Sequence, residues 1–168
     1  REHGIPTLGI CLGMQCMVIE FARNVLGWSD AHTTEIDPST THKVVDLMEE
    51  QKSISDLGGS MRLGGYDCVL RPGSKIAAAY GSDFIRERHR HRFEFNSQYR
   101  EAYEAAGMLC AGSNPDTGLV ETVELSDHRW YVGVQYHPEY RSTVLHPSPL
   151  FMAFVKEAIA YGSEKHPA

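Results

Sequence analysis

The pentapeptide Gly9-Ile10-Cys11-Leu12-Gly13 constrains the fold of this chain more than any other part of the sequence, because the residue pattern changes there. The residues before it, from Ile5 to Ile10, form a short apolar run bounded by glycine, which is typical of a strand buried on both faces. Between Gly13 and Leu26 apolar residues recur every three or four positions, and Gly27 lies where a helix would end. The sequence therefore predicts a strand, a tight turn and a helix in direct succession.

Cys11 lies at the bend between this strand and this helix. A residue at such a bend is held in a strained backbone conformation that exposes its side chain. We expect Gly9 and Gly13 to be required because the turning chain passes too close for a Cβ atom. The N–H groups of the helix start favour a thiolate and should lower the thiol pKa from about 8.5. Cys11 is therefore a candidate nucleophile, and the alternative from the pentapeptide alone is a thiol packed in a glycine-rich turn.

A thiolate nucleophile needs a base, and the base needs a group that fixes its tautomer. The predicted strand from Trp130 to Tyr136 is followed by His137-Pro138-Glu139, which places a histidine at a strand end with a carboxylate two residues later. Because Pro138 fixes one backbone angle, Glu139 can turn back and accept a hydrogen bond from the imidazole. His137 is therefore the candidate base and Glu139 the group that orients it.

The remaining sequence predicts an α/β layered domain with a β-rich excursion after the first helix. Residues 28–65 are rich in Thr, Ser, Asp and Gly, which indicates loops and short strands. Strands are predicted at 66–70, 90–95, 108–111, 119–125 and 130–136, with turn signals at Asn114-Pro115-Asp116 and Ser126-Asp127. Helical segments are predicted at 75–80, at 97–106, and from Pro149 through Phe151, Phe154, Val155 and Ile159.

Composition narrows the classes of partner. The net charge of −6 argues against nucleic acid, and no apolar run reaches the roughly 18 residues that a membrane span needs. Without a signal-peptide pattern, we expect a cytoplasmic protein. The basic residues Arg86, Arg88, Arg90 and Arg92 lie within seven positions with Glu87 among them, which suggests recognition of a small anionic group. Cys16, Cys68 and Cys110 form no CxxC pair and are expected to be structural thiols.

Two segments resemble the signatures of class I, or triad-type, glutamine amidotransferases. They are Gly9-Ile10-Cys11-Leu12-Gly13-Met14-Gln15 and Val134-Gln135-Tyr136-His137-Pro138-Glu139. Two longer segments, Asp56 to Gly64 and Glu87 to Glu94, resemble the CTP synthase family within this superfamily. The resemblance implies a flavodoxin-like class I glutaminase domain with a mostly parallel sheet.

The resemblance also implies roles for individual residues. Cys11 would attack the side-chain amide of L-glutamine to form a γ-glutamyl thioester, His137 would protonate ammonia and then activate water, and Glu139 would orient His137. The residues Leu12, Gly13, Met14 and Gln15 would line the glutamine site, with the Gln15 side chain and nearby backbone N–H groups available to the oxyanion. Glu35 would receive the α-ammonium group and Arg90 would bind the α-carboxylate. A zwitterion needs such a pair of fixed charges.

For the whole enzyme, the resemblance implies an ATP- and Mg²⁺-dependent synthetase domain in the same polypeptide that uses the ammonia to convert UTP to CTP. GTP would be an allosteric activator, the full-length enzyme would be a homotetramer, and the residues for ATP, UTP and Mg²⁺ would lie outside this segment. Arginines other than Arg90 could instead contact the synthetase domain.

Length bears on how much of the domain is present. The nucleophile at position 11 leaves room for one strand before it, whereas the corresponding strand of a doubly wound sheet is central. An oxyanion hole of this kind also takes a backbone N–H from a second loop. We therefore expect residues 1–168 to be the C-terminal portion of a single glutaminase domain. Two alternatives remain for the function: a free γ-glutamyl hydrolase or peptidase with the same triad, and a catalytically silent binding domain.

Overall fold

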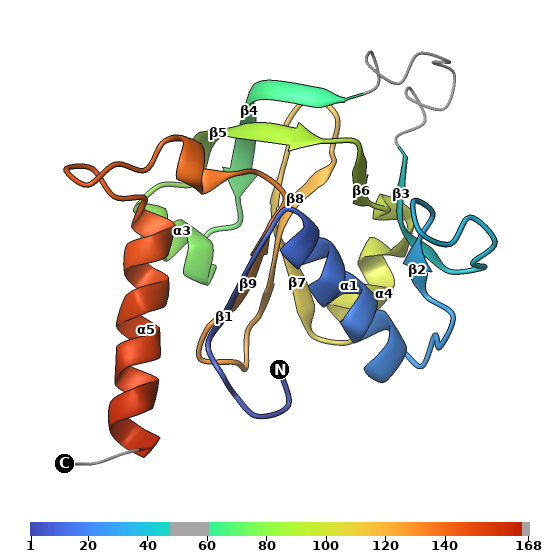
Figure 1. Ribbon diagram of the computed structural model, residues 1–168, viewed down its shortest axis with the longest axis horizontal. Coiled ribbons are helices and arrows are strands. Elements are labelled where there is room, and N and C mark those ends of the chain that lie inside the picture. Colours follow the sequence, from blue (N-terminus) through green and yellow to red (C-terminus); the bar gives the residue numbers. More distant parts are fainter. Residues whose placement is uncertain (48–60, 166–168) are drawn as a thin grey trace.

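The computed structural model describes residues 1–47 and 61–165 (Figure 1). The strands are β1 (Thr7–Ile10), β2 (His32–Thr33), β3 (Lys43–Leu47), β4 (Arg62–Leu70), β5 (Phe84–His91), β6 (Phe93–Phe95), β7 (Met108–Ser113), β8 (Val120–Leu125) and β9 (Tyr131–Val134). The helices are α1 (Leu12–Asn24), α3 (Lys75–Tyr80), α4 (Arg100–Ala105) and α5 (Pro149–Lys165), with 3₁₀ turns η1 (Ser97–Tyr99) and η2 (Pro138–Tyr140). Positions 56–60 of the segment that resembles CTP synthases lie outside the described residues.

The predicted succession of strand, turn and helix at the start of the chain is confirmed. Helix α1 begins directly after Cys11, and its buried face carries Met14, Met17, Val18 and Phe21, the residues that define its apolar repeat. Val25, the fifth residue of that repeat, is 40 % exposed because the helix has already ended at Asn24.

The prediction of one strand over residues 90–95 is wrong. The chain instead forms β5 and β6 on either side of Arg92, and β4 begins at Arg62 although Gly64 and Gly65 favour a loop there. The cause is tertiary, since β4 and β5 pair residue by residue from Arg62 opposite His91 to Val69 opposite Phe84. A long ladder of this kind overrides the local signal of a glycine pair.

The expectation of a mostly parallel sheet is also wrong. The main sheet has the order β1-β9-β8-β7-β4-β5, and only its β1–β9 pair is parallel. The connections after β7 and β8 are short turns, and a parallel crossover needs a dozen or more residues. The turn signals at 114–116 and 126–127 therefore require antiparallel neighbours. The predicted β-rich region supplies β2 and β3, which form a separate three-stranded sheet with β6.

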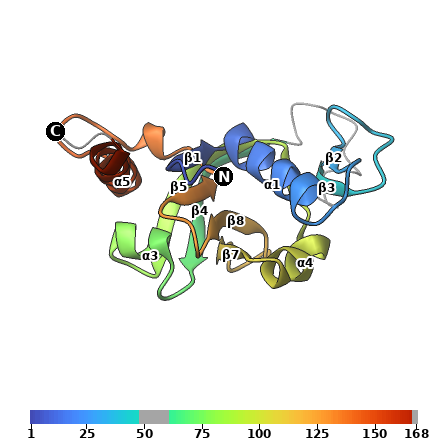
Figure 2. The same ribbon diagram turned by 90° about the horizontal axis from the view of Figure 1, so that it is seen from below.

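Helices cover the main sheet on two faces. Figure 2 shows α1 and α4 on one side of the strands and α3 and α5 on the other. Strand β9 contributes to both cores, because Tyr131 packs with residues of α1 and α4 whereas Val132 and Val134 pack with residues of α3 and α5. Strand β9 is therefore buried on both of its faces.

Only part of the predicted apolar face of helix α5 is buried. Leu150 is fully buried and Phe154 packs against the core, whereas Val155 and Ile159 are 50 % and 65 % exposed. The sheet face that α5 covers meets only the N-terminal part of the helix, and α3 is the helix it contacts.

Strand β1 lies at one edge of the main sheet, and β9 is its only partner among the described strands. The expectation that further strands of a larger domain flank β1 stays a prediction.

Candidate active site

The backbone bends sharply at Cys11. Its φ of 51° and ψ of −105° make it the one residue other than glycine with positive φ in the described part of the chain. The bend is held on both sides, because the N–H of Cys11 donates to the Val134 carbonyl at 2.8 Å and its carbonyl accepts from the Gln15 N–H at 3.2 Å. Strain of this kind persists only where the surroundings impose it. The predicted strained turn is therefore confirmed.

The two glycines beside Cys11 differ in the space that a Cβ atom would have. A Cβ at Gly9 would collide with Met17 Sδ and lie 2.7 Å from the carbonyl carbon of Gly13, so no larger residue fits. A Cβ at Gly13 would meet nothing within 4 Å. The prediction that close packing requires glycine is confirmed at Gly9 and wrong at Gly13, where the missing side chain would point into open space.

His137 and Glu139 contact each other directly. The Nδ1 atom of His137 lies 2.5 Å from Oε1 of Glu139, and the His137 backbone N–H donates to the Arg88 carbonyl of β5 at 2.8 Å. The imidazole also stacks on Tyr140, with ring centroids 5.2 Å apart. Its Nε2 atom is buried and has no hydrogen-bond partner among the described residues. With Nδ1 bound to a carboxylate, Nε2 of the neutral ring is the free acceptor.

Cys11 and His137 come from neighbouring parallel strands. Ile10 lies opposite Val134 in the β1–β9 ladder, Cys11 follows β1 directly, and His137 lies three residues beyond Val134. Since the carboxyl ends of parallel strands meet at the same edge of a sheet, Cys11 and His137 lie at one edge of the main sheet. Residues 126 positions apart in the sequence are joined in this way.

The surroundings of Cys11 do not favour the thiolate as the sequence predicts. Burial raises the pKa of the Cys11 thiol, the backbone N–H of Leu12 lowers it, and the charges of Glu139 and Glu35 raise it further. The side-chain amide of Gln135 lowers it. The expectation of a lowered pKa is therefore wrong: the helix N-terminus acts in the predicted direction, but loss of solvation outweighs it. Burial therefore favours the thiol over the thiolate at Cys11.

The residues expected to line a glutamine site occupy different environments. Leu12 is 58 % exposed, Gly13 borders open space, and Met14 is buried in the core against Gly133. Gln15 is also buried, and its Nε2 donates to the Phe93 carbonyl at 2.9 Å and to Gln135 Oε1 at 3.3 Å. Both N–H groups of the Gln15 amide are thus directed at the protein, and its expected place in the glutamine site stays a prediction.

Glu35 and Arg90, the predicted charged pair, come from different elements. Glu35 is exposed after β2, and its charge raises the pKa of Cys11. Arg90 is exposed on β5 and lines a cavity of about 390 Å³ together with Tyr140, the stacking partner of His137. Arg92, two residues later, is half-buried with a buried Nε atom at the turn into β6.

Sequence reasoning assigned no role to Gln135, although the residue lies within the second signature. Gln135 is fully buried, and its Nε2 donates to Cys11 Sγ at 3.6 Å. Its position two residues before His137, on a strand predicted to end beside Cys11, was the signal that could have identified it.

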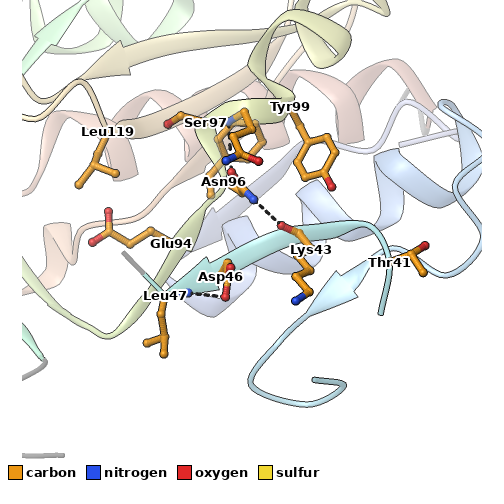
Figure 3. A pocket seen from close by; sticks show the side chains of 11 residues that line it. Thr41, Lys43, Asp46, Leu47, Glu94, Asn96, Ser97, Tyr99 and Leu119 are labelled. Carbon is orange, nitrogen blue, oxygen red and sulfur yellow. Dashed lines mark hydrogen bonds between the residues drawn. The ribbon is translucent and has the colours of Figure 1, made fainter. Parts of the chain in front are cut away.

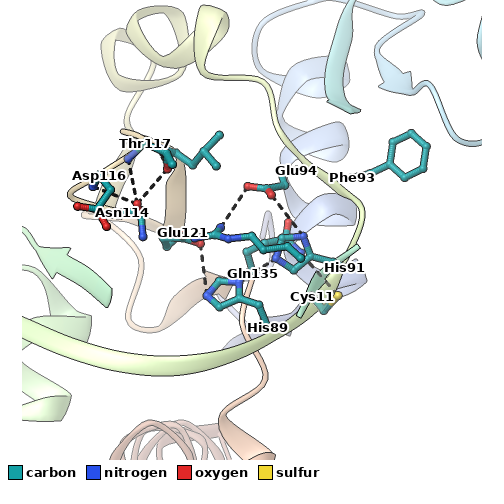
Figure 4. A network of polar contacts seen from close by, with 12 residues as sticks. Cys11, His89, His91, Phe93, Glu94, Asn114, Asp116, Thr117, Glu121 and Gln135 are labelled. Carbon is teal, nitrogen blue, oxygen red and sulfur yellow. Dashed lines mark hydrogen bonds and ion pairs between the residues drawn. The ribbon is translucent and has the colours of Figure 1, made fainter. Parts of the chain in front are cut away.

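The arginine-rich segment has two faces. Strand β5 directs Arg86, Arg88 and Arg90 outward and buries Glu87, His89 and His91. The buried histidines join a polar cluster with residues of other strands, which Figure 4 shows beside Cys11 and Gln135. The members of this cluster are Arg62, His89, His91, Glu94 and Glu121.

The polar cluster is built around one cation. The Arg62 guanidinium lies 2.7 Å from Glu121 Oε1 and 3.3 Å from Glu94 Oε2, and His89 Nδ1 lies 2.8 Å from His91 Nε2. Burial raises the pKa of Glu94 to about 7 and lowers the pKa of His91 to about 3. Burial therefore favours the neutral form of the two histidines and of Glu94, and Arg62 is the cation that faces both carboxyl groups.

A separate cavity of about 480 Å³ lies among β3, β6 and η1, where Figure 3 shows Lys43, Asp46 and Asn96 around it. None of the predicted site residues lines it. In residues 1–47 and 61–165 no group of three or more His, Cys, Asp or Glu side chains could hold a metal ion. No helix in the same ranges is long and apolar enough to cross a membrane.

Comparison with known proteins places the chain among enzymes of one kind. Residues 1–157 match the family model of class-I glutamine amidotransferases. The chain is 72 % identical over 159 residues to a CTP synthase of Porphyromonas gingivalis and 62 % identical to one of Bacteroides fragilis. Each match covers 95 % of this chain, which spans 30 % of the length of these relatives.

A solved structure shares the fold closely. The glutaminase domain of Trypanosoma brucei CTPS with bound acivicin superposes with a TM-score of 0.89 at 38 % identity. The match covers 95 % of this chain and 62 % of that one.

Proposed function

Because the chain belongs to the class I glutamine amidotransferase family, we propose that it is the glutaminase part of a CTP synthase, which hydrolyses L-glutamine and supplies ammonia for CTP synthesis. The observation that supports the proposal is the placement of Cys11 and the His137–Glu139 pair after the paired strands β1 and β9. The high identity to CTP synthases supports the choice of this enzyme over other members of the family.

The first half of the reaction forms a γ-glutamyl thioester. The thiol proton of Cys11 passes to Nε2 of His137, and the sulfur attacks the side-chain amide carbon of glutamine. The negative charge on the carbonyl oxygen is stabilised by backbone N–H groups near the bend at Cys11. The imidazolium then protonates the amide nitrogen, the C–N bond breaks, and ammonia leaves.

The second half releases the enzyme. His137 removes a proton from water, the resulting oxygen nucleophile attacks the thioester carbon, and the C–S bond breaks to give glutamate. The thiolate then recovers the proton from His137. Throughout, the contact of 2.5 Å with Glu139 holds Nδ1 so that Nε2 faces the reacting atoms.

Binding of glutamine uses two oppositely charged side chains. Glu35 receives the α-ammonium group and Arg90 the α-carboxylate, while Leu12 and Gly13 form the exposed start of α1 that the substrate contacts. The side chains of Met14 and Gln15 support this surface from the core rather than touching the substrate.

The rest of the proposed reaction would belong to a longer protein, because the chain spans 30 % of the length of its curated relatives. A synthetase part of the same polypeptide would use ATP and Mg²⁺ to activate UTP, and ammonia from Cys11 would displace the phosphate to give CTP. GTP would activate glutamine hydrolysis, and the full-length protein would be a homotetramer.

Labelling and product analysis of the full-length protein test the proposal. A glutamine-analogue diazoketone should label Cys11 irreversibly, free glutamine should yield ammonia, and glutamine should support CTP formation from UTP. Cleavage of γ-glutamyl peptides without any hydrolysis of glutamine would instead identify a γ-glutamyl hydrolase and refute the proposal.

A further inference from the structure

Gln135 occupies a fixed position behind the nucleophile. Its side chain is fully buried directly after β9, and its backbone N–H donates to the Glu121 carbonyl of β8 at 2.8 Å. From this position its Nε2 reaches Cys11 Sγ at 3.6 Å, which is within hydrogen-bond range for sulfur (Figure 4). A buried polar side chain aimed at a sulfur atom calls for a functional explanation.

Gln15 determines which end of the Gln135 amide faces the sulfur. One hydrogen of Gln15 Nε2 is directed to the Phe93 carbonyl and the other to Gln135 Oε1. If the Gln135 amide were rotated by half a turn, its NH₂ group would face the NH₂ group of Gln15 and its oxygen would face the sulfur. Both contacts would be repulsive when Cys11 is a thiolate, so the observed orientation is the one the network selects.

We infer that Gln135 donates a hydrogen bond that stabilises the Cys11 thiolate, and that Gln15 is the positioning residue that orients the Gln135 amide for this task. This inference rests on the proposed glutaminase function. It explains why two long polar side chains are buried between α1 and β9, where apolar residues would otherwise complete the core.

The hydrogen bond matters at two points of the reaction. It opposes the loss of solvation when the thiol transfers its proton to His137, because hydrogen bonds to charged groups are stronger than those to neutral ones. It also stabilises the thiolate as the leaving group when water attacks the thioester. The thioester sulfur carries no charge and gains less, so the contribution differs between reaction states.

Other charged and titratable groups around the sulfur act in the opposite direction or serve as the base. They are Glu35 after β2, Glu139 in η2, and His137 at the end of β9. Besides the Leu12 backbone N–H, Gln135 is the neighbour that favours the negative sulfur. Its removal should therefore be visible in the titration of Cys11.

The test is the pH dependence of Cys11 alkylation by iodoacetamide in the full-length protein, followed by mass spectrometry of the labelled peptide. A Cys16→Ser background removes the exposed thiol that shares the helix. Gln135→Met keeps the side-chain length and removes the donor. It should raise the pKa of Cys11 by about one to two units, with a fall of ~10–100-fold in alkylation rate at neutral pH.

Two further variants make the result specific. Gln15→Met leaves Gln135 in place but unoriented, so it should shift the pKa in the same direction by about half a unit, a ~3-fold change in rate. It also carries the test if Gln135→Met fails to fold. Tyr136→Phe alters the adjacent, equally buried residue and should leave the alkylation profile unchanged.

An unshifted profile in folded Gln135→Met, or an equal shift in Tyr136→Phe, overturns the inference. Glutamine hydrolysis by the unmodified protein is measured in parallel. Its absence would refute the proposed function, whereas the thiol titration would still decide the role of Gln135.

Discussion

At the scale of single residues, the proposed site includes a cysteine whose backbone is strained and whose burial disfavours the thiolate. Cys11 is strained in backbone and partly buried, and burial raises the pKa of its thiol. In the proposed mechanism His137 is the proton acceptor, and the 2.5 Å contact with Glu139 supplies the orientation that this transfer needs. The residue types were evident from the sequence, but the balance of charge and burial around them was not.

Glu35 offers a direct test of substrate binding at this scale. In the full-length protein, Glu35→Gln should raise the KM for glutamine ~10–100-fold with a smaller effect on kcat, because it removes a charge-assisted bond to the α-ammonium group. Initial rates of glutamine hydrolysis give both constants. CTP formation from added ammonium should be unchanged, and an unaltered KM would remove Glu35 from the site.

The same assay compares Arg90 with its neighbour. Arg90→Met should raise the KM for glutamine, whereas Arg92→Met is the matched variant at the turn into β6. A rise in KM confined to Arg92→Met would assign the α-carboxylate to Arg92 instead.

At the scale of elements, pairing between strands determined the strand bounds and directions that local sequence patterns did not predict. The apolar repeat of α1 and the helical turn at 75–80 could be predicted because each depends on near neighbours. Strand propensity could not predict the extent of β4, the break at Arg92 or the antiparallel arrangement. The ladders that impose these features join residues that are distant in the sequence. The buried histidines of β5 likewise depend on Arg62 and Glu121 from other strands.

The packing at the junction of β1 and α1 predicts that substitutions at Gly9 and Gly13 differ in their effect on stability. Gly9→Ala should destabilise the protein by about 1–3 kcal/mol, because its Cβ would collide with the backbone of Gly13. Gly13→Ala is the matched control and should be neutral or slightly stabilising, since it meets open space in a helix. Urea unfolding of both variants measures the difference, and equal stabilities would contradict the packing at Gly9.

The pKa values in the polar cluster predict how the stability of the protein depends on pH. The pKa of His91 falls from 6.5 to about 3 in the folded state, chiefly because of burial and then because of Arg62. Between these values the unfolded chain binds more protons, so the stability that neutral His91 contributes is complete above pH 6.5 and is lost as pH falls towards 3. Glu94, whose pKa rises to about 7, acts in the opposite direction, since its destabilising effect disappears as pH falls.

His91→Gln isolates the histidine contribution. Between pH 6.5 and 5 the variant should lose less stability than the unmodified protein, by about 1.4 kcal/mol per pH unit at most. Hydrogen exchange in peptides that cover β4 and β5 provides the measurement. Identical pH slopes in the two proteins would mean that His91 is not buried as a neutral group.

At the scale of the whole molecule, the β1–β9 pair joins the first strand of the chain to the last. Cys11 directly follows β1 and His137 follows β9, so the proposed site forms only when these two strands pair in the main sheet. The chain spans 30 % of the length of its curated relatives, so the proposed use of ammonia is tested in the full-length protein.

Glutamine and ammonium as separate nitrogen sources distinguish glutamine hydrolysis from CTP formation. In the full-length protein, Cys11→Ala should abolish CTP formation from glutamine and retain CTP formation from ammonium, because only the first route needs the thiol. Cys16→Ala, which changes an exposed thiol on the same helix, should retain both. CTP formation followed by absorbance checks each route, and glutamine-dependent synthesis by Cys11→Ala would contradict the mechanism.

The sequence by itself determined the bend at Cys11, the first helix, the His137–Pro138–Glu139 turn and the family to which they belong. Each of these is local, being set by neighbouring residues through turn geometry, periodicity and short motifs. Only the tertiary structure decided that the sheet is mixed, that Gly9 and not Gly13 is sterically required, and that Gln135 reaches the sulfur. These features depend on contacts between residues far apart in the chain, and burial at those contacts reversed the expected shift in the pKa of Cys11.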